Sequence, residues 1–284
     1  MINKGTGQSV GETLNKLVSQ LETKSETPDL DSQSLLAHLL DKPTSWLLAH
    51  PEHPLSHQKL NILEEYTSQL DAGKPLPYVL GHWEFFGLEF EVTPDVLIPR
   101  PETELLVERA LAWLYANPDC RRVADIGTGS GCICVALAVN IPDLVMEATD
   151  VSAAALEVAR RNASRHEVSG RMEFTCGDLF SPDSAYHLVV ANLPYIPTVT
   201  LHQLPVYGRE PTVALDGGVD GMLLIRRLLV EAPAHLLPGG MLLMEIEATE
   251  GLAALSQASD IFPKARIQLL RDLSGHDRLL EIQI

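Results

Sequence analysis

Apolar residues recur every three or four positions over residues 1–72, the spacing that places them on one face of an α-helix. The segment Ser9–Glu12 fits a capping box and predicts the start of a first helix. Pro43 predicts the end of a second helix, and Gly73 the end of the last one. We therefore expect a small helical bundle, with apolar faces formed by Leu14, Leu17, Val18 and Leu21, by Leu35, Leu36, Leu39 and Leu40, by Trp46, Leu47 and Leu48, and by Leu60, Leu63 and Leu70.

The segment 73–101 differs in composition, because proline, glycine and aromatic residues become frequent there. Between Trp83 and Val92, apolar and polar residues alternate around Gly87, which is typical of a β-hairpin. We expect this segment to be a hairpin linker between the bundle and the rest of the chain.

From residue 102 onward, short apolar runs alternate with longer segments of helical period. This alternation predicts an α/β domain over residues 102–284, with a mainly parallel sheet covered by helices on both faces. The expected strands are 123–126, 144–149, 172–175, 187–191 and 241–246 with a terminal strand pair, and the expected helices are 105–115, one running through Leu137, 153–163 and 223–235.

The chain of 284 residues is acidic, with a formal net charge of −17. This balance argues against a protein that binds nucleic acid by bulk charge, since phosphate neutralisation needs clustered Lys and Arg. No signal peptide is visible, and no apolar stretch approaches the roughly 20 residues of a membrane span. We expect a cytoplasmic protein with no membrane, no metal and no stable nucleic acid binding, because no metal-ligand spacing involves its four cysteines, Cys120, Cys132, Cys134 and Cys176.

The segment 125–131 lies where a predicted strand meets a predicted helix. Its glycines permit a tight turn and a close approach of a ligand to the backbone. The spacing G-x-G-x-G differs from the G-x-G-x-x-G of dinucleotide sites, and an acid precedes it. An acid there suits a ligand with an ammonium group, and S-adenosylmethionine carries one. The candidate cofactor-binding residues of this loop are Asp125, Gly127, Thr128, Gly129, Ser130 and Gly131.

Two further acids follow the next two predicted strands. Asp150 stands where a carboxylate can accept both hydroxyls of a ribose. Asp178 can accept a hydrogen bond from an adenine amine, while Leu179 packs on the ring. Each acid alone could instead be a helix N-cap or a solvated loop end. Their place at consecutive strand ends, beside the glycine loop, favours the cofactor site.

The tetrad Asn192-Leu193-Pro194-Tyr195 follows the fourth predicted strand, at the edge where open parallel sheets bind ligands. Methylating an amide nitrogen requires acceptors that hold both N–H groups and aim the lone pair. The Asn192 side-chain oxygen and the Leu193 carbonyl can do this, and the Tyr195 ring can cover the planar group. Asn192 also counts among the candidate cofactor contacts. The alternative is an ordinary Asn-x-Pro turn.

Together with 125–131 and 192–195, the segment Ile98-Pro99-Arg100-Pro101-Glu102-Thr103-Glu104 resembles the HemK/PrmC glutamine methyltransferases. These enzymes modify the glutamine of the Gly-Gly-Gln motif in class I peptide chain release factors. The resemblance implies a Rossmann-like fold with a mainly parallel seven-stranded sheet, S-adenosylmethionine as cofactor, S-adenosylhomocysteine as product, and a bundle at 1–72 that helps to dock the release factor. It extends to 73–78, Gly81, 85–87, 209–211, 216–218 and 272–278.

Two positions depart from the family pattern. Leu193 replaces the first proline of the usual Asn-Pro-Pro-Tyr, which leaves its carbonyl in place but makes the loop less rigid. Glu247 stands where the family commonly has glycine. Ribosomal RNA adenine dimethyltransferases also carry Asn-Leu-Pro-Tyr and are the main rival interpretation. A glutamine methyltransferase of ribosomal proteins is another, as is a binding module without turnover.

Overall fold

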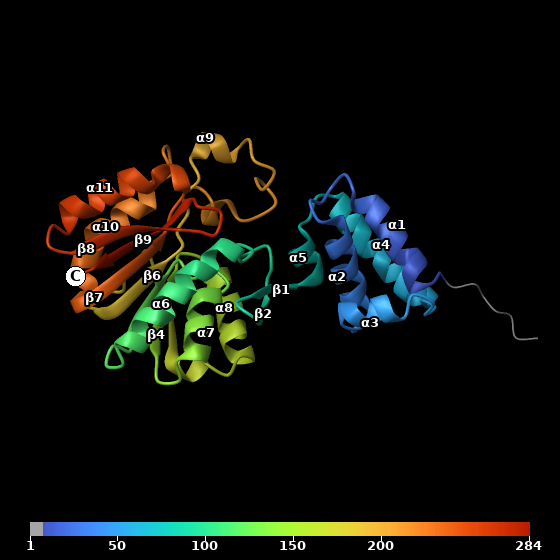
Figure 1. Ribbon diagram of the computed structural model, residues 1–284, viewed down its shortest axis with the longest axis horizontal. Coiled ribbons are helices and arrows are strands. Elements are labelled where there is room, and N and C mark those ends of the chain that lie inside the picture. Colours follow the sequence, from blue (N-terminus) through green and yellow to red (C-terminus); the bar gives the residue numbers. More distant parts are fainter. Residues whose placement is uncertain (1–7) are drawn as a thin grey trace, which may run out of the picture. The chain divides into compact units, whose positions relative to one another are not determined.

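The computed structural model describes residues 8–284, and the chain divides into two compact units. The first unit ends at Gly81 and the second begins at His82 (Figure 1). Each unit buries apolar side chains in a core of its own.

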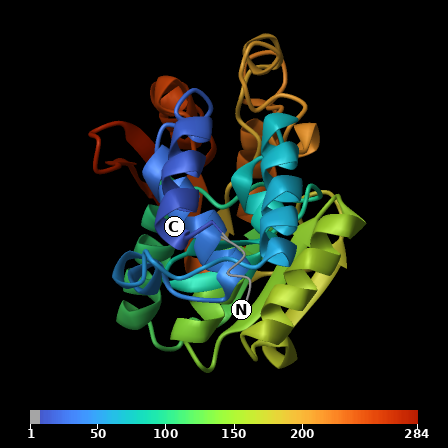
Figure 2. The same cartoon turned by 90° about the vertical axis from the view of Figure 1, so that its right-hand side faces the viewer.

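Residues 8–81 form a helical bundle, coloured blue to cyan in Figures 1 and 2. The Ser9 hydroxyl accepts from the Glu12 amide, and the Glu12 carboxylate accepts from the Ser9 amide, so the expected capping box is confirmed. Ser56 caps the fourth helix in the same way, accepting from the Lys59 amide. The helices are α1 Val10–Leu21, α2 Pro28–Leu40, α3 Thr44–Ala49, α4 His57–Asp71 and α5 Leu76–Leu80.

The bundle unit continues past residue 72, where we expected it to end. Helix α5 lies within the expected linker, yet all five of its residues are buried, and Leu76 joins the core of the bundle. Pro75 and Pro77 suggested a linker, but Pro75 occupies the N-cap position and Pro77 lies in the first turn, where no intrahelical partner awaits the missing N–H. The compact unit therefore ends at Gly81.

The second unit is built on a seven-stranded sheet with the order β5-β4-β3-β6-β7-β9-β8. Strands β3 to β7 are parallel, whereas β9 is antiparallel to both β7 and β8. This topology confirms the expected α/β fold with its mainly parallel sheet. The strands are β3 Arg122–Ile126, β4 Val145–Asp150, β5 Met172–Cys176, β6 Tyr186–Ala191, β7 Leu236–Glu245, β8 Arg266–Arg271 and β9 Asp277–Gln283.

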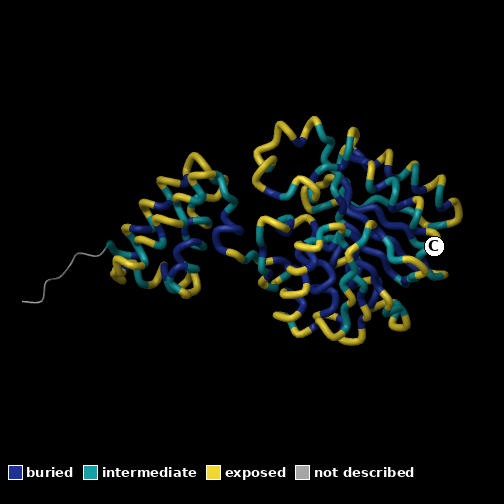
Figure 3. The backbone as a smooth tube through the Cα atoms, turned by 180° about the vertical axis from the view of Figure 1, so that it is seen from behind, coloured by how far each residue is buried: buried dark blue, intermediate teal, exposed yellow. Residues whose placement is uncertain are grey.

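Helices cover both faces of the sheet. Successive residues of a strand point to opposite faces, and in the central strands both sets are apolar, so each face needs a layer of helices to bury it. Val123 packs in one core, with α6 (Glu104–Ala116) and α7 (Cys132–Asn140). Its neighbour Ala124 packs in the other, with α10 (Leu223–His235) and α11 (Gly251–Ile261). Figure 3 shows the central strands buried between these layers.

The expected hairpin is present as β1 (His82–Phe85) and β2 (Leu88–Glu91), but it is not a free linker. Phe85 and Phe90 lie in the core that contains α6 and α7. Asn162 of α8 (Ala153–Arg165) is fully buried and holds β2, since its side chain accepts from the Glu91 amide and donates to the Glu91 carbonyl.

Sequence patterns did not predict α9 (Thr198–Leu201) or α11. Helix α11 starts at a glycine without a side-chain cap, and its buried contacts include two alanines, which makes its apolar stripe weak. Among residues 8–284, no helix is both long enough and apolar enough to cross a membrane.

Candidate functional site

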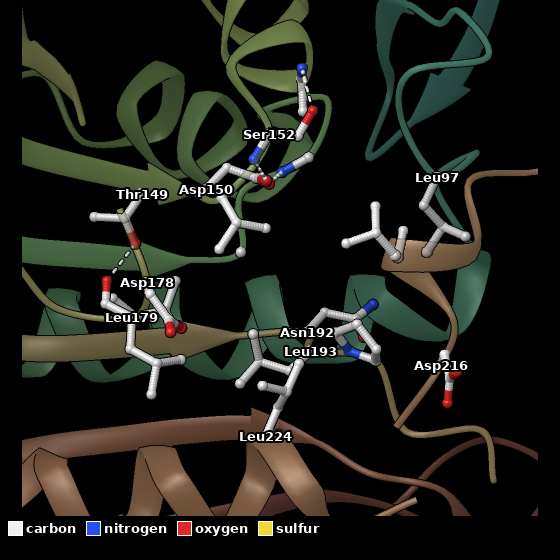
Figure 4. A pocket seen from close by; sticks show the side chains of 18 of the residues that line it. Leu97, Thr149, Asp150, Ser152, Asp178, Leu179, Asn192, Leu193, Asp216 and Leu224 are labelled. Carbon is white, nitrogen blue, oxygen red and sulfur yellow. Dashed lines mark hydrogen bonds between the residues drawn. The ribbon is translucent and has the colours of Figure 1, made fainter. Parts of the chain in front are cut away.

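The predicted site residues gather at the carboxyl ends of the parallel strands. Strands β3 and β6 are neighbours, but β4 and β5 lie on the other side of β3, so the strand order reverses between β3 and β6. Open α/β sheets bind ligands at such a switch point. A cavity of about 510 Å³ lies here (Figure 4), lined among others by Leu97, Gly127, Gly129, Asp150, Ser152, Asp178, Leu179, Asn192, Leu193, Pro194, Asp216 and Leu224.

The glycine loop is folded against the strands and helices beside it. Gly127, Gly129 and Gly131 all have positive φ, between 54° and 79°, which favours glycine. A Cβ on Gly131 would lie 3.1 Å from the Cβ of Ala159, so glycine lets this turn approach α8 closely. A Cβ on Gly129 would meet no protein atom within 4 Å, and Gly129 lines the cavity. A ligand can therefore approach the bare backbone at this position.

Asp125 lies behind the glycine loop and not in the lining of the cavity. It is fully buried, and its Oδ2 accepts from the Thr128 hydroxyl at 2.7 Å and from the Cys134 amide at 3.3 Å. Its other oxygen has no partner among the described residues. Burial raises the pKa of Asp125 to about 6, against the hydrogen bonds, which lower it. Asp125 therefore links the glycine loop to the start of α7 through these two hydrogen bonds. Because its Oδ1 accepts no hydrogen bond from residues 8–284, the ionised form of the carboxyl group is disfavoured.

Replacing Asp125 with asparagine is expected to reduce the pH dependence of stability. Because burial raises the folded-state pKa from 3.8 to about 6, the stability this group contributes is complete in acid and is lost as pH rises towards 6. A shift of about two units corresponds to about 3 kcal/mol. Urea unfolding between about pH 4 and pH 7 measures the loss for both proteins. Equal losses in the wild type and Asp125→Asn would contradict this assignment.

Asp150 is the last residue of β4, and it connects the loop after β4 to the glycine loop. One carboxylate oxygen accepts from the Gly129 amide at 2.9 Å, and the other accepts from the Ser152 amide at 2.8 Å (Figure 4). Burial raises its pKa, although these bonds oppose the shift. A carboxylate has about four acceptor positions, so Asp150 retains capacity for two ligand hydroxyls.

Asp178 and Leu179 lie at the opposite side of the cavity from Leu97 (Figure 4). Asp178 is exposed, and its Oδ2 accepts from Nη2 of Arg227 at 2.9 Å. Leu179 is buried with a φ of 64°, and its carbonyl accepts from the Thr149 hydroxyl at 2.7 Å. The hydrogen bond holds Leu179 in this unusual backbone conformation, with its apolar side chain in the cavity wall.

The donor set fits S-adenosylmethionine. The cavity has bare backbone at Gly129, a carboxylate with spare acceptor capacity at Asp150, and apolar surface at Leu97, Leu179 and Leu224. Asp125 is buried behind the loop, and one of its oxygens has no partner among the described residues. No group of three or more His, Cys, Asp or Glu that could hold a metal occurs among the described residues.

Asn192, directly after β6, is held by a residue that the sequence patterns did not single out. Its Nδ2 donates to the Thr103 hydroxyl at 3.0 Å. Thr103 lies in the 3₁₀ turn Pro101–Thr103 and is 2% exposed. One N–H of this amide is engaged with Thr103, and the amide oxygen is available to accept a hydrogen bond from a ligand.

Tyr195 is held by Glu245, the last residue of β7. The phenol donates to Oε1 of Glu245 at 3.2 Å. Glu245 is 1% exposed, and burial raises its pKa, opposed by Thr103, Arg278 and Tyr195. Burial also raises the pKa of the Tyr195 phenol well above its usual range. Tyr195 therefore stays a neutral hydrogen-bond donor, and its ring is fixed in the loop.

A smaller cavity of about 90 Å³ adjoins the first, and both contact Asn192, Leu193 and Pro194. Tyr195 and Arg100 line only this second cavity of the two. Arg100 pairs with Glu210 at 2.5 Å, and Glu210 also accepts from the Ile98 amide at 3.1 Å. Residues 192–194 therefore lie between the two cavities and line both of them.

Apart from Tyr195, which lines only the small cavity, the structure separates the predicted residues into two groups. Gly127, Gly129, Asp150, Asp178, Leu179 and Asn192 to Pro194 line the large cavity, whereas Asp125, Thr128, Ser130 and Gly131 build the loop behind it. Thr103 and Glu245 were missed as site residues. Thr103 lies in the segment 98–104 that carries the family resemblance. No local sequence pattern could show that it contacts Asn192, which is 89 positions away.

Leu193 replaces a family proline, and its side chain fills space beside the glycine loop. It is 4% exposed, and its Cδ2 lies 2.8 Å from where a Cβ on Gly127 would stand. It also belongs to the core that contains α10. Leucine therefore adds apolar packing between the loops after β3 and β6.

Leu193→Pro is expected to keep turnover within about tenfold of wild type, because the backbone carbonyl remains. It should lower the unfolding midpoint, since part of the leucine side chain no longer packs against Gly127 and the core. Leu193→Ala is the matched control, with a similar packing loss and no ring. An inactive proline variant beside an active alanine variant would show that the ring disturbs the loop.

Comparison with known proteins identifies related sequences over most of the chain. A family model described as the PrmC N-terminal domain matches residues 12–81, and one described as a methyltransferase small domain matches residues 102–203. The release factor glutamine methyltransferase of Coxiella burnetii is 39% identical and covers 96% of this chain and 98% of that protein. That of Moorella thermoacetica is 39% identical and covers 95% of each.

A solved structure supports the fold assignment. The hMettl16 catalytic domain in complex with the MAT2A 3'UTR hairpin 6 matches with a TM-score of 0.54 and 15% identity, covering 69% of this chain and 76% of that one. At this identity the match shows a shared fold and nothing of the substrate.

Proposed function

Because this chain belongs to the release factor glutamine methyltransferase family, we propose that it methylates the side-chain amide nitrogen of the glutamine in the Gly-Gly-Gln motif of class I peptide chain release factors, with S-adenosylmethionine as donor. One observation supports this most strongly. Thr103 holds the nitrogen of the Asn192 amide, which leaves its oxygen as an acceptor between the two cavities.

The chemistry requires positioned acceptors more than a strong base. An amide nitrogen is a weak nucleophile, because its lone pair is delocalised into the carbonyl. When bound, S-adenosylmethionine supplies a methyl group on a sulfonium sulfur that leaves as a neutral thioether. Asn192 Oδ1 and the Leu193 carbonyl accept the two N–H groups and aim the lone pair at the methyl group. Holding the reactants in this way lowers the entropic part of the barrier.

The large cavity is the donor side in this proposal, and the small one is the acceptor side. Asp150 binds the ribose hydroxyls, Asp178 accepts from the adenine amine, and Leu179 packs on the ring. Asp125 acts through the glycine loop and as a buried negative charge near the cation. On the acceptor side, Pro194 and Tyr195 enclose the glutamine amide and exclude water, which suits a transition state in which the sulfonium charge is spread over donor and amide. The N–C bond forms as the S–C bond breaks, and the amide nitrogen then loses one N–H proton to solvent, which carries away the positive charge.

The substrate is proposed to be a protein and not an RNA base. With a net charge of −17, the enzyme gains nothing from phosphate neutralisation, whereas it can complement a basic protein surface. The bundle of residues 8–81 adds a separate surface for docking such a partner. Binding energy from that surface can help to seat one glutamine beside Asn192.

The test is a parallel incubation with labelled donor of an intact release factor, a short peptide containing Gly-Gly-Gln, ribosomal proteins and ribosomal RNA. The intact factor should be labelled fastest and the peptide far more slowly. Labelling confined to RNA or to a ribosomal protein would refute the proposal, and equal rates for peptide and factor would refute the docking role.

A further inference from the structure

We propose that Asn162 is a positioning residue for the donor, and that it holds the glycine loop 125–131 in its binding conformation in the absence of S-adenosylmethionine. This inference rests on the donor side of the proposed function. Asn162 lies in α8, is fully buried and lines neither of the two cavities at the tetrad. It therefore acts through the segments that its side chain contacts.

The side-chain amide of Asn162 has a partner for both of its N–H groups and for its oxygen. Nδ2 donates to the Ser130 carbonyl at 2.8 Å and to the Glu91 carbonyl at 3.0 Å. Oδ1 accepts from the Glu91 amide at 2.7 Å. Because two of these three neighbours are carbonyl oxygens and the third is an N–H group, only one orientation of the amide satisfies all of them. Asparagine at this position matches its neighbours in number of donors and acceptors.

The bond to Ser130 joins α8 to the glycine loop. Ser130 directly follows Gly129, whose backbone lines the large cavity. One turn before Asn162 on α8, the Cβ of Ala159 lies 3.1 Å from where a Cβ on Gly131 would stand. Helix α8 therefore contacts the loop at two successive residues, by a hydrogen bond at the first and by close packing at the second.

The bonds to Glu91 hold the strand that leads into another wall of the same cavity. Glu91 is the last residue of β2, and residues 95–97 follow it and line the large cavity. Leu97 lies across this cavity from Asp178 (Figure 4). One buried amide therefore joins the glycine loop to the chain segment that forms a second wall of the donor cavity.

The composition of the loop explains why it needs such a contact. Glycine loses more conformational freedom than other residues when it is ordered, and this loop contains three glycines with positive φ. A loop that occupies its binding conformation only part of the time binds a ligand with an affinity reduced by that fraction. Contacts with the bound donor then hold the loop themselves. We therefore expect Asn162 to affect the donor Kd and not kcat at saturating donor.

The test is calorimetry with S-adenosylmethionine on the full chain carrying Asn162→Asp or Arg161→Ala. An ionised aspartate has nearly the size of asparagine but donates no hydrogen bond, so both carbonyls lose their partner. Arg161 is the matched control, because it precedes Asn162 in α8 and pairs with the Glu91 carboxylate at 2.7 Å, while its side chain is 49% exposed. We expect the donor Kd to rise at least about tenfold in Asn162→Asp, and to stay within about threefold of wild type in Arg161→Ala.

Steady-state rates with an intact release factor separate the positioning of the donor from a general loss of structure. In Asn162→Asp the KM for the donor should rise with its Kd, whereas kcat at saturating donor should stay within about threefold of wild type. An unchanged donor Kd in the folded variant would overturn the inference. An equal rise of Kd in Arg161→Ala would also overturn it, because the attachment of the hairpin would then carry the effect.

A measurement on the wild-type chain applies if Asn162→Asp does not fold. The Gly129 amide donates to Asp150, and the Gly131 amide donates to the Thr128 carbonyl, so their hydrogen exchange reports whether the loop is held. Without donor, both amides should exchange at least about tenfold more slowly than in an unstructured peptide. Exchange at the unstructured rate would overturn the inference. A wild-type chain that binds the donor but leaves the release-factor glutamine unmodified would refute the proposed function and not this inference, which the donor Kd decides.

Discussion

Replacing Asn192 with alanine should lower kcat by at least about 100-fold, the scale of loss when a positioning contact at the reacting atoms disappears. The donor Kd should change by less than about threefold, because an interaction made mainly in the transition state lowers kcat and not ground-state binding. The structural basis is that Nδ2 of Asn192 donates to Thr103, and that Asn192 lines both cavities. Steady-state rates and calorimetry with S-adenosylmethionine measure the two quantities.

Asn192→Asp is a useful companion, because it keeps the size but cannot donate to Thr103. It should lose most of the turnover as well, since the orientation of the side chain is no longer fixed. Retention of more than half of the wild-type kcat by Asn192→Ala would mean that the nucleophile is held elsewhere.

Replacing Asp150 with alanine should have its largest effect on the donor. Removing a charged acceptor of the ribose hydroxyls costs about 1.5–3 kcal/mol, which is roughly a 10- to 150-fold rise in the donor Kd. The variant also loses the bonds from the Gly129 and Ser152 amides, so the glycine loop becomes less fixed. Calorimetry measures the change in Kd.

Asp178→Ala is the control for that measurement, because Asp178 is exposed and one of its oxygens is engaged with Arg227. Its effect on the donor Kd should be smaller. An Asp150→Ala variant that folds and binds the donor as tightly as wild type would remove Asp150 from the cofactor site.

The strands, the larger helices and the sheet edge that carries the site could be predicted, because each depends on local patterns. The segment 125–131 combines a strand end with glycines whose backbone needs a positive φ, and the structure places it at the switch point. Asn192 follows the neighbouring strand β6, so parallel pairing alone brings it to the same edge. Family resemblance then indicated which reaction this edge performs.

The supporting contacts could not be predicted, because they join residues that are distant in sequence. Thr103 and Asn192 are 89 positions apart, and Tyr195 and Glu245 are 50 apart. Nothing in a local pattern shows that Asp125 is outside the lining of the cavity or that Glu245 is buried. The carboxylate of Glu247 lies 3.9 Å from Nη1 of Arg278, and nothing in the structure explains why it replaces glycine.

Mass spectrometry of an intact class I release factor, incubated with this protein and S-adenosylmethionine, tests the central proposal most directly. We expect one added methyl group on the side chain of the Gly-Gly-Gln glutamine, and none when the enzyme carries Asn192→Ala. An unmodified glutamine, beside methylation of ribosomal RNA or of another protein under the same conditions, would contradict it.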